Sequence, residues 1–137
     1  MPSVVTAVPA AESSRAVAHF ESALGFETDC WDVHHALSEG PDFVLIDVRS
    51  PELFARGHVP QAINIPHGKL LQSRLDRFAP GTTFVVYCAG PHCNGGHRGA
   101  IRLARLGRPV KLMIGGMSGW REEGFAIETG PGSVAAG

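Results

Sequence analysis

The chain has 137 residues, a formal net charge of −1 and a hydrophobic fraction of 44%. This length matches one ordinary domain, the near-neutral charge argues against electrostatic binding of nucleic acid, and the apolar fraction is too high for a disordered chain. No apolar run approaches the roughly 20 residues that span a bilayer, and the N-terminus lacks the cationic start and apolar stretch of a signal peptide. We therefore expect one globular domain in the cytoplasm, with no nucleic-acid or membrane partner.

The first quarter of the chain predicts a helix followed by an edge strand. Residues 13–25 place apolar side chains at helical spacing and end on a glycine, which predicts an amphipathic helix. Residues 26–31 have the pattern of a short edge strand. Asp32 has the character of an N-cap for a second helix that ends near Leu37.

The rest of the chain alternates strands with helices. Two continuous apolar runs, Phe43–Ile46 and Phe84–Cys88, are typical of parallel strands that are covered on both faces. Shorter runs at 62–65 and 110–114 predict further strands. Helices are predicted to begin at Ser50 and Pro51, to cover 68–78 and 98–106, and to surround Trp120. This alternation favours an α/β fold with an open parallel sheet and helices on both faces.

The predicted elements divide the chain into three parts. We expect residues 1–25 to form an N-terminal helical extension and residues 26–128 to form the domain. Residues 129–137 are small residues with one proline, so we expect them to form a mobile tail.

The chain has three cysteines, Cys30, Cys88 and Cys93, which is an odd number. Their spacing gives neither a Cys-x-x-Cys redox pair nor the paired ligands of a structural zinc site. In a reducing compartment we expect them to be reactive thiols. Cys88 falls where a buried strand ends, and ligands of open parallel sheets gather at that edge. The next helix begins there too, and its N-terminus carries roughly half a positive charge, which favours a thiolate.

Glycines follow Cys88 in the sequence, at positions 90, 95, 96 and 99. They allow backbone N–H groups to turn inward as a nest for an anion or a second sulfur atom, and Arg98 adds a fixed cation. These features predict that Cys88 is an activated sulfur nucleophile. The alternative is that Cys88 is a small core residue and that the glycines only turn the chain.

Four segments, in the same order, resemble the rhodanese family over roughly Asp32 to Glu128. They are Leu45–Glu52 (LIDVRSPE), Gly57–Pro66 (GHVPQAINIP), Val85–Cys88 (VVYC) and Ile114–Trp120 (IGGMSGW). The resemblance implies a five-stranded parallel sheet flanked by helices. It also implies a cysteine that takes sulfane sulfur from a small anionic donor such as thiosulfate, holds it as a persulfide, and passes it to a thiol or cyanide.

The resemblance implies no metal or organic cofactor, because sulfur itself is carried, and an acceptor protein is a further candidate partner. By the same resemblance Asp47 and Arg49 are structural, the carboxylate tying backbone and arginine groups together beneath the active loop. The loop residues expected to bind the donor are Ala89, Gly90, His92, Asn94, Gly95, Gly96, His97 and Arg98.

The loop departs from the family pattern, in which four residues separate the cysteine from an arginine. Arg98 lies ten positions after Cys88, with nine residues between them, whereas four residues separate Cys93 from Arg98, which is the family spacing. If Cys88 is the nucleophile, the loop has gained about two residues, and loops tolerate insertions. We therefore prefer Cys88, and Cys93 is either an alternative nucleophile or a thiol that resolves a Cys88 persulfide or sulfenate as a disulfide.

The same loop allows three other interpretations. Cys88, His92, Cys93 and His97 do not have the spacing of a closed structural zinc site, so we predict no metal. The segment from His92 to Arg98 is one residue shorter than the loop of a cysteine phosphatase or arsenate reductase. A non-catalytic or thiol-redox-sensing interaction domain is the alternative of a different class.

Overall fold

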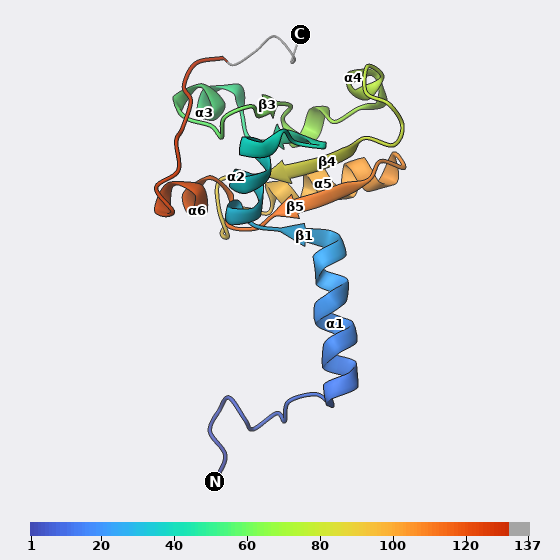
Figure 1. The fold of residues 1–137 in the computed structure, drawn as a ribbon, viewed down its shortest axis with the longest axis vertical. Coiled ribbons are helices and arrows are strands. Elements are labelled where there is room, and N and C mark those ends of the chain that lie inside the picture. Colours follow the sequence, from blue (N-terminus) through green and yellow to red (C-terminus); the bar gives the residue numbers. More distant parts are fainter. Residues whose placement is uncertain (132–137) are drawn as a thin grey trace.

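A computed structural model describes residues 1–131 of the chain, and its centre is a five-stranded sheet (Figure 1). The strands lie in the order β1-β5-β4-β2-β3, and each neighbouring pair is parallel. Their bounds are β1 Glu27–Thr28, β2 Phe43–Asp47, β3 Ile63–Asn64, β4 Thr83–Tyr87 and β5 Val110–Met113. The structure therefore confirms the predicted five-stranded parallel sheet. The edge strand predicted over 26–31 is shorter, because Phe26 ends one helix and Cys30 begins the next.

Helices cover both faces of this sheet, and one further helix, α1 Ser13–Phe26, precedes it. The covering helices are α2 Cys30–Glu39, α3 Pro51–Arg56, α4 Gln72–Leu75, α5 Gly95–Arg105 and α6 Gly116–Glu122, with a 3₁₀ turn, η1, at His67–Lys69. On one face Leu45 and Val85 pack in a cluster with residues of α2, α3 and α6. On the other face Ile46 and Val86 pack with Leu70, which follows η1, and with residues of α4 and α5. Neighbouring residues of β2 and β4 are thus buried on opposite faces, which explains their unbroken apolar sequences.

The predicted helix start at Asp32 is wrong. Helix α2 begins at Cys30, because Asp29 is its N-cap and accepts a hydrogen bond at Oδ1 from the Asp32 backbone N–H at 2.8 Å. Asp32 lies in the first turn, where its negative charge complements the helix dipole. The helix also continues past Leu37 to Glu39. By contrast, the predicted cap at Ser50 is confirmed, since its hydroxyl accepts from the backbone N–H of Leu53.

The single helix predicted over 68–78 is also wrong, because the chain forms η1 and the short α4 instead. Between them Leu71 has extended backbone angles. Leu70 and Leu75 are buried against the sheet while Leu71 is exposed. A continuous helix would place Leu71 and Leu75, four residues apart, on the same face, so the break allows Leu75 to be buried without Leu71.

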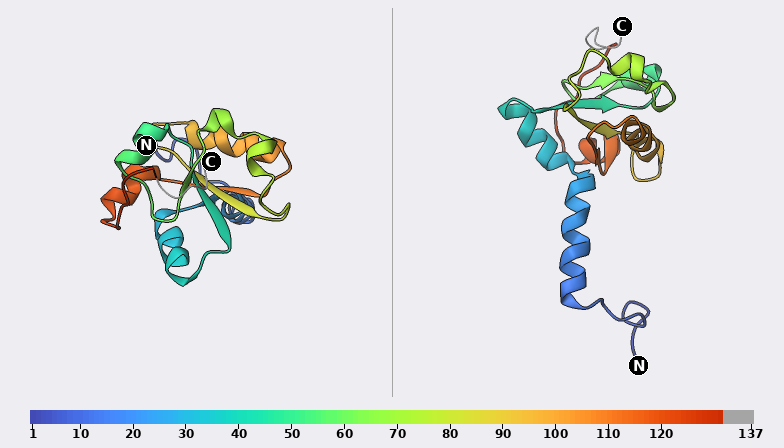
Figure 2. Two further views of the ribbon diagram at one scale, coloured as in Figure 1. Left: turned by 90° about the horizontal axis from the view of Figure 1, so that it is seen from above. Right: turned by 90° about the vertical axis from the view of Figure 1, so that its right-hand side faces the viewer.

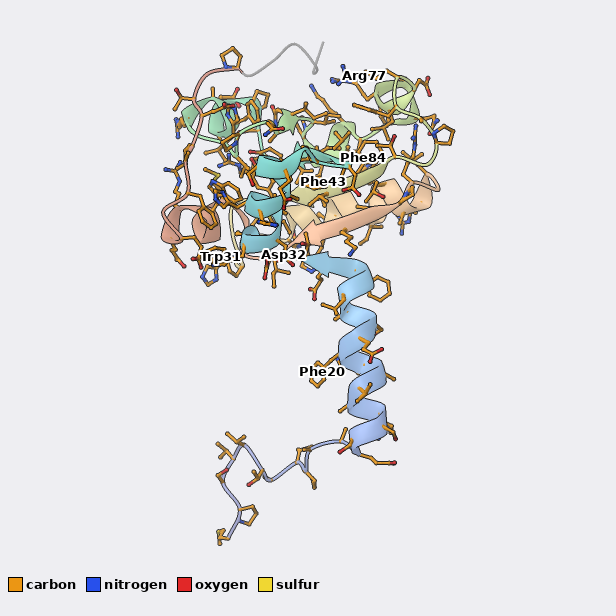
Figure 3. The ribbon with its side chains drawn as sticks, viewed as in Figure 1. Phe20, Trp31, Asp32, Phe43, Arg77 and Phe84 are labelled. Atoms are coloured by element: carbon orange, nitrogen blue, oxygen red, sulfur yellow. A yellow bond between two sulfur atoms is a disulfide. The ribbon has the colours of Figure 1, made fainter. Side chains whose placement is uncertain are left out.

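Helix α1 stands away from the rest of the molecule (Figure 2). It runs from Ser13 through Phe26, close to the predicted bounds. Phe20 and Leu24 on its apolar face remain 67% and 68% exposed, and Figure 3 shows Phe20 projecting from the helix. Lys111 donates a hydrogen bond from Nζ to the Leu24 carbonyl at 2.8 Å, which fixes the last turn of α1 to β5.

The segment after α6 returns across the molecule to α3. His58 and Glu128 form an antiparallel bridge, and the Gly130 N–H donates to the Ala55 carbonyl at 2.8 Å. The mobile tail predicted for 129–137 stays a prediction, because residues 132–137 lie outside the described residues.

Candidate active site

Cys88 is the first residue after β4, and its backbone is held on two sides. The strand is buried, and Cys88 itself is 8% exposed. Its carbonyl accepts a hydrogen bond from the Met117 N–H at 2.9 Å, and the carbonyl of Ala89 accepts from Ser118 N–H at 2.8 Å. The start of helix α6 therefore fixes the start of the loop, and with it the thiol, at the carboxyl edge of the sheet.

Cys88 and Cys93 are joined as a disulfide, with their Cα atoms 6.5 Å apart. The loop between them is folded by a turn in which the Cys93 N–H donates to the Gly90 carbonyl at 3.0 Å. The two cysteines that the sequence leaves as alternatives thus occupy one site. Cys88 is supplied by the strand and Cys93, which is less buried, by the loop.

Helix α5 begins at Gly95, three residues before its predicted start at Arg98, so its first turn lies directly against the sulfur atoms. The Gly95 N–H donates to Cys93 Sγ at 3.4 Å. A Cβ atom on Gly95 would lie 2.7 Å from Cys88 Sγ, and one on Gly96 would lie 2.6 Å from Leu112 Cδ1. Glycine is therefore what allows the positive end of this helix to approach the thiols.

A pocket of about 370 Å³ opens beside the two cysteines. Its lining consists of Cys88, Gly90, Pro91, Cys93, Gly96, His97, Leu112, Met113, Ile114, Gly115 and Gly116. Gly115 and Gly116 have positive φ angles, and a Cβ atom on Gly116 would lie 2.6 Å from the Cys88 carbonyl oxygen. Sequence reasoning used these two glycines only within the segment Ile114–Trp120 and missed that they line the same pocket as Gly96 and His97 of α5.

Residues 31–123 match the rhodanese-like domain family. The chain belongs to this family. Its relatives include HTH-type transcriptional regulator Rv0324 of Mycobacterium tuberculosis, 39% identical over 93 residues, or 67% of this chain and 40% of that protein. A sulfurtransferase of Allochromatium vinosum is 28% identical over 106 residues, 74% of this chain and 92% of that protein. The crystal structure of protein BH2092 from Bacillus halodurans is similar with a TM-score of 0.83 and 34% identity, covering 86% of this chain and 87% of that one.

The chain spans less than half of the length of the regulator that it matches. A regulator and a sulfurtransferase are thus both similar to this rhodanese-like domain, so the family membership alone leaves the activity open. The arrangement of the loop residues is the evidence that bears on it.

The structure gathers some predicted loop residues around the sulfur atoms and separates others. Gly90, Gly96 and His97 line the cysteine pocket, and Gly95 lies against both sulfur atoms. Arg98 is exposed, donates from Nε to Asn94 Oδ1 at 3.2 Å, and lines another groove beside Leu70 and Leu71. His92 and Ala89 are also exposed. The donor to the cysteine sulfur atoms is therefore the Gly95 backbone N–H, whereas the Arg98 guanidinium bonds to Asn94.

Asp47 and Arg49 form a buried ion pair at the end of β2. The Asp47 carboxylate is fully buried and accepts hydrogen bonds from the backbone N–H, Nε and Nη2 of Arg49, at 2.9, 3.0 and 2.7 Å. Arg49 Nη2 also donates to the Gly57 carbonyl at 2.6 Å, and Asn64 Nδ2 donates to the carbonyls of both Asp47 and Arg49. The ion pair thus links β2 to the segment after α3, and the Asn64 amide links β3 to the same two residues.

Tyr87 connects this ion pair to the strand that carries Cys88. Its hydroxyl oxygen accepts a hydrogen bond from the Val59 N–H at 3.1 Å. Burial, together with the charge of Asp47, raises the pKa of Tyr87 well above its usual value, so the phenol stays neutral. The Tyr87 carbonyl accepts from the Val48 N–H at 3.1 Å, which fixes the end of β4 to the residue between Asp47 and Arg49.

Cys30 is a third thiol, buried on the far side of the Gly115–Gly116 wall, where it lies 3.7 Å from the Ile114 carbonyl and 3.8 Å from that of Gly116. Burial, reinforced by the charges of Asp29 and Glu123, raises the pKa of the Cys30 thiol to about 11. A raised thiol pKa keeps the group protonated, and therefore unreactive, until the pH approaches that value.

We predict that the reduced, folded protein takes up an alkylating reagent on Cys88 and Cys93 but not on Cys30. At pH 8 only about one Cys30 in a thousand is ionised, given its raised pKa. The measurement is intact mass after brief treatment with iodoacetamide, with and without denaturant. Two labels in the folded protein and three in the unfolded protein are expected, and labelling of folded Cys30 at the rate of the loop cysteines would contradict the prediction.

We predict that Gly95→Ala destabilises the disulfide-bonded protein by about 1–3 kcal/mol, the usual cost of overpacking. The added methyl group would lie 2.7 Å from Cys88 Sγ and 3.3 Å from Cys93 Sγ. Gly68→Ala is the matched control, because a Cβ atom there has open space within 4 Å. Urea unfolding of the oxidised variants measures the difference, and equal midpoints for the two variants would contradict the packing at Gly95.

Two absences hold for the part of the chain that the structure describes, residues 1–131. Among these residues no group of three or more histidine, cysteine, aspartate and glutamate side chains is placed to hold a metal ion. In the same part of the chain, every helix is too short or too polar to cross a membrane.

Proposed function

We propose that this rhodanese-like domain is a cytoplasmic sulfurtransferase in which Cys88 carries the sulfur. The observation that supports it most is the position of Cys88 Sγ, at the end of β4, against the first turn of α5 and open to a pocket. An N-terminal helical turn stabilises a thiolate and the terminal charge of a persulfide. Membership of the family and the sulfurtransferase relative support the same activity.

The proposed reaction has two steps. The Cys88 thiolate attacks the outer sulfur of a donor such as thiosulfate, the donor's S–S bond breaks, and sulfite leaves with the electron pair. A thiol or cyanide then attacks the outer sulfur of the persulfide and restores the Cys88 thiolate. The Cys88–Cys93 disulfide has to be reduced to two thiols before the first step, which a reducing cytoplasm favours.

Cys88 is better suited than Cys93 to be the nucleophile. Its backbone is fixed by β4 on one side and by the Met117 N–H on the other. Cys93 lies on the loop and touches α5 through the Gly95 N–H. A nucleophile held by a strand keeps its position relative to the donors that stabilise the developing charge.

Measuring the release of sulfite from thiosulfate tests the proposal. Reduced, desalted protein is mixed with thiosulfate in the absence of any acceptor, and sulfite is measured over the first turnovers. We expect a rapid release of one sulfite per protein, which becomes continuous when cyanide is added together with a dithiol that keeps Cys88 and Cys93 reduced. The absence of sulfite release from fully reduced protein would overturn the proposed function.

The disulfide favours a second candidate, a thiol-redox-sensing interaction domain. Such a domain needs only the reversible Cys88–Cys93 bond, which the structure contains. It would cycle between dithiol and disulfide with mild oxidants and dithiols, and it would release no sulfite from thiosulfate. A cysteine phosphatase has less support, because Arg98 bonds to Asn94 and lines a different groove from the thiols.

A further inference from the structure

We propose that Cys93 is a second catalytic residue that converts the Cys88 persulfide into free sulfide. In this step Cys93 attacks the persulfide, sulfide leaves, and the Cys88–Cys93 disulfide closes. The inference rests on the proposed function, since it needs a persulfide on Cys88. It adds a further activity, the reductive release of sulfide from a sulfane-sulfur donor with a cellular dithiol as the reductant.

The first support is that the two sulfur atoms meet within one folded loop. Cys93 Sγ is bonded to Cys88 Sγ, and the turn from Gly90 to Cys93 holds the loop in the shape that allows it. The carbonyls of Cys88 and Ala89 are tied to α6 at the same time. A thiol held this close reacts as an intramolecular nucleophile, which gives it a large advantage over thiols in solution.

The position of Cys93 also indicates which sulfur it attacks. A persulfide has an inner sulfur, Cys88 Sγ, and an outer sulfur that came from the donor. Attack on the outer sulfur would only move the persulfide to Cys93. In the structure Cys93 Sγ is bonded to Cys88 Sγ, which is the inner sulfur of the persulfide. Attack of Cys93 on the inner sulfur therefore forms the same bond that the structure contains.

The surroundings of Cys93 suit a nucleophile and a leaving group. The Gly95 N–H, in the first turn of α5, points at Cys93 Sγ from 3.4 Å and stabilises its thiolate. The pocket of about 370 Å³ is lined by both cysteines, so it has space for the outer sulfur and a route for its departure. Hydrogen sulfide is a stronger acid than a cysteine thiol, and in thiol exchange the more acidic leaving group departs faster.

The step balances without any additional oxidant. The electron pair of the Cys93 thiolate forms the new bond to Cys88 Sγ, and the bond from Cys88 Sγ to the outer sulfur breaks. Its electron pair leaves with the outer sulfur, which takes up the proton lost by Cys93 and departs as HS⁻. A cellular dithiol then reduces the disulfide by exchange and becomes a disulfide itself. With thiosulfate the sum is thiosulfate plus dithiol giving sulfite, sulfide and the oxidised dithiol.

A single-turnover experiment tests the inference. Reduced protein, freed of reductant, is mixed with one equivalent of thiosulfate, and sulfite, sulfide and protein mass are measured together. For the unchanged protein we expect one sulfite and one sulfide per chain, with conversion of the dithiol to the Cys88–Cys93 disulfide. For Cys93→Ser we expect one sulfite, at most a small fraction of the sulfide, and one sulfur atom retained on the protein.

Cys30→Ser is the matched control, because it removes a thiol that faces away from the pocket. It should release sulfide as the unchanged protein does. If the unchanged protein releases sulfite but keeps the sulfur and releases no sulfide, the role of Cys93 is wrong and the proposed sulfurtransferase stands. If it releases neither product, the proposed function itself has failed. Equal release of sulfide by the Cys93→Ser variant would also overturn the inference.

Discussion

Cys88→Ser is expected to lower the rate of sulfur transfer from thiosulfate to cyanide by a factor on the order of a thousand or more. A serine hydroxyl cannot form a persulfide, so the variant loses the covalent step rather than weakening it. The side chain is nearly isosteric, and Cys88 makes its backbone contacts through its carbonyl, so the fold and the pocket should persist. Thiocyanate formation by the reduced protein measures the rate.

The control for this prediction is Cys30→Ser, which removes a buried thiol outside the pocket lining. Its transfer rate should stay close to that of the unchanged protein. Far-ultraviolet circular dichroism of each variant shows whether it has folded. If Cys88→Ser retains transfer while Cys93→Ser loses sulfite release, the nucleophile is Cys93 and the assignment made from the strand position is wrong.

Asp47→Ala is expected to lower the free energy of unfolding by about 3–5 kcal/mol, the usual cost of removing one partner from a buried ion pair. The carboxylate is fully buried and accepts hydrogen bonds from three nitrogen atoms of Arg49. Its loss leaves the guanidinium buried with only the Gly57 carbonyl as a hydrogen-bond acceptor among the bonds described above. Domains of this kind have only about 5–15 kcal/mol of stability, so the loss is a large fraction of it.

Asp42→Ala is the matched control, because it makes the same change at an exposed position just before β2. Its effect should stay within about 0.5 kcal/mol. Urea unfolding of both variants gives the comparison. Replacing the pair together, as Asp47→Leu with Arg49→Met, should recover part of the loss, because no buried charge is then left unpaired. Equal stabilities for Asp47→Ala and Asp42→Ala would contradict the structural role of the pair.

The sheet could be predicted because its strands carry a simple signal. Phe43–Ile46 and Phe84–Cys88 are apolar at every position, and the structure buries alternate residues of β2 and β4 on opposite faces. Such runs are typical of parallel strands, and the alternation with helices then limits the arrangement of the chain. The N-cap at Ser50 could also be predicted, because a helix cap depends on only a few neighbouring residues.

The errors arose where distant contacts decide the local structure. Leu70, Leu71 and Leu75 have a helical pattern, but the surface they meet buries only two of them, and the backbone breaks accordingly. Asp29 and Asp32 are both suitable caps, and the structure uses Asp29, which places the buried Cys30 in the first turn of α2. A sequence pattern contains the candidates in each case, while the packing partner selects among them.

The candidate site shows the same division. Its cysteines and glycines could be found from the sequence, but whether Cys88 and Cys93 meet depends on a turn between Gly90 and Cys93 that their spacing does not determine. Because α5 begins at Gly95, Arg98 lies one helical turn after Asn94. Its side chain bonds to Asn94 and does not line the cysteine pocket. The sequence predicted that α5 begins at Arg98, three residues too late. This error placed Arg98 among the residues expected to bind the sulfur donor.

The most direct test of the central claim is the position of the sulfur atom after reaction with the donor. Reduced Cys93→Ser protein is treated with thiosulfate, the persulfide is capped with an alkylating reagent, and the peptides are sequenced by tandem mass spectrometry. A sulfurtransferase that uses Cys88 is predicted to carry one additional sulfur on Cys88 and none on Cys30. Unmodified Cys88 under conditions in which the protein is folded and fully reduced would contradict the claim.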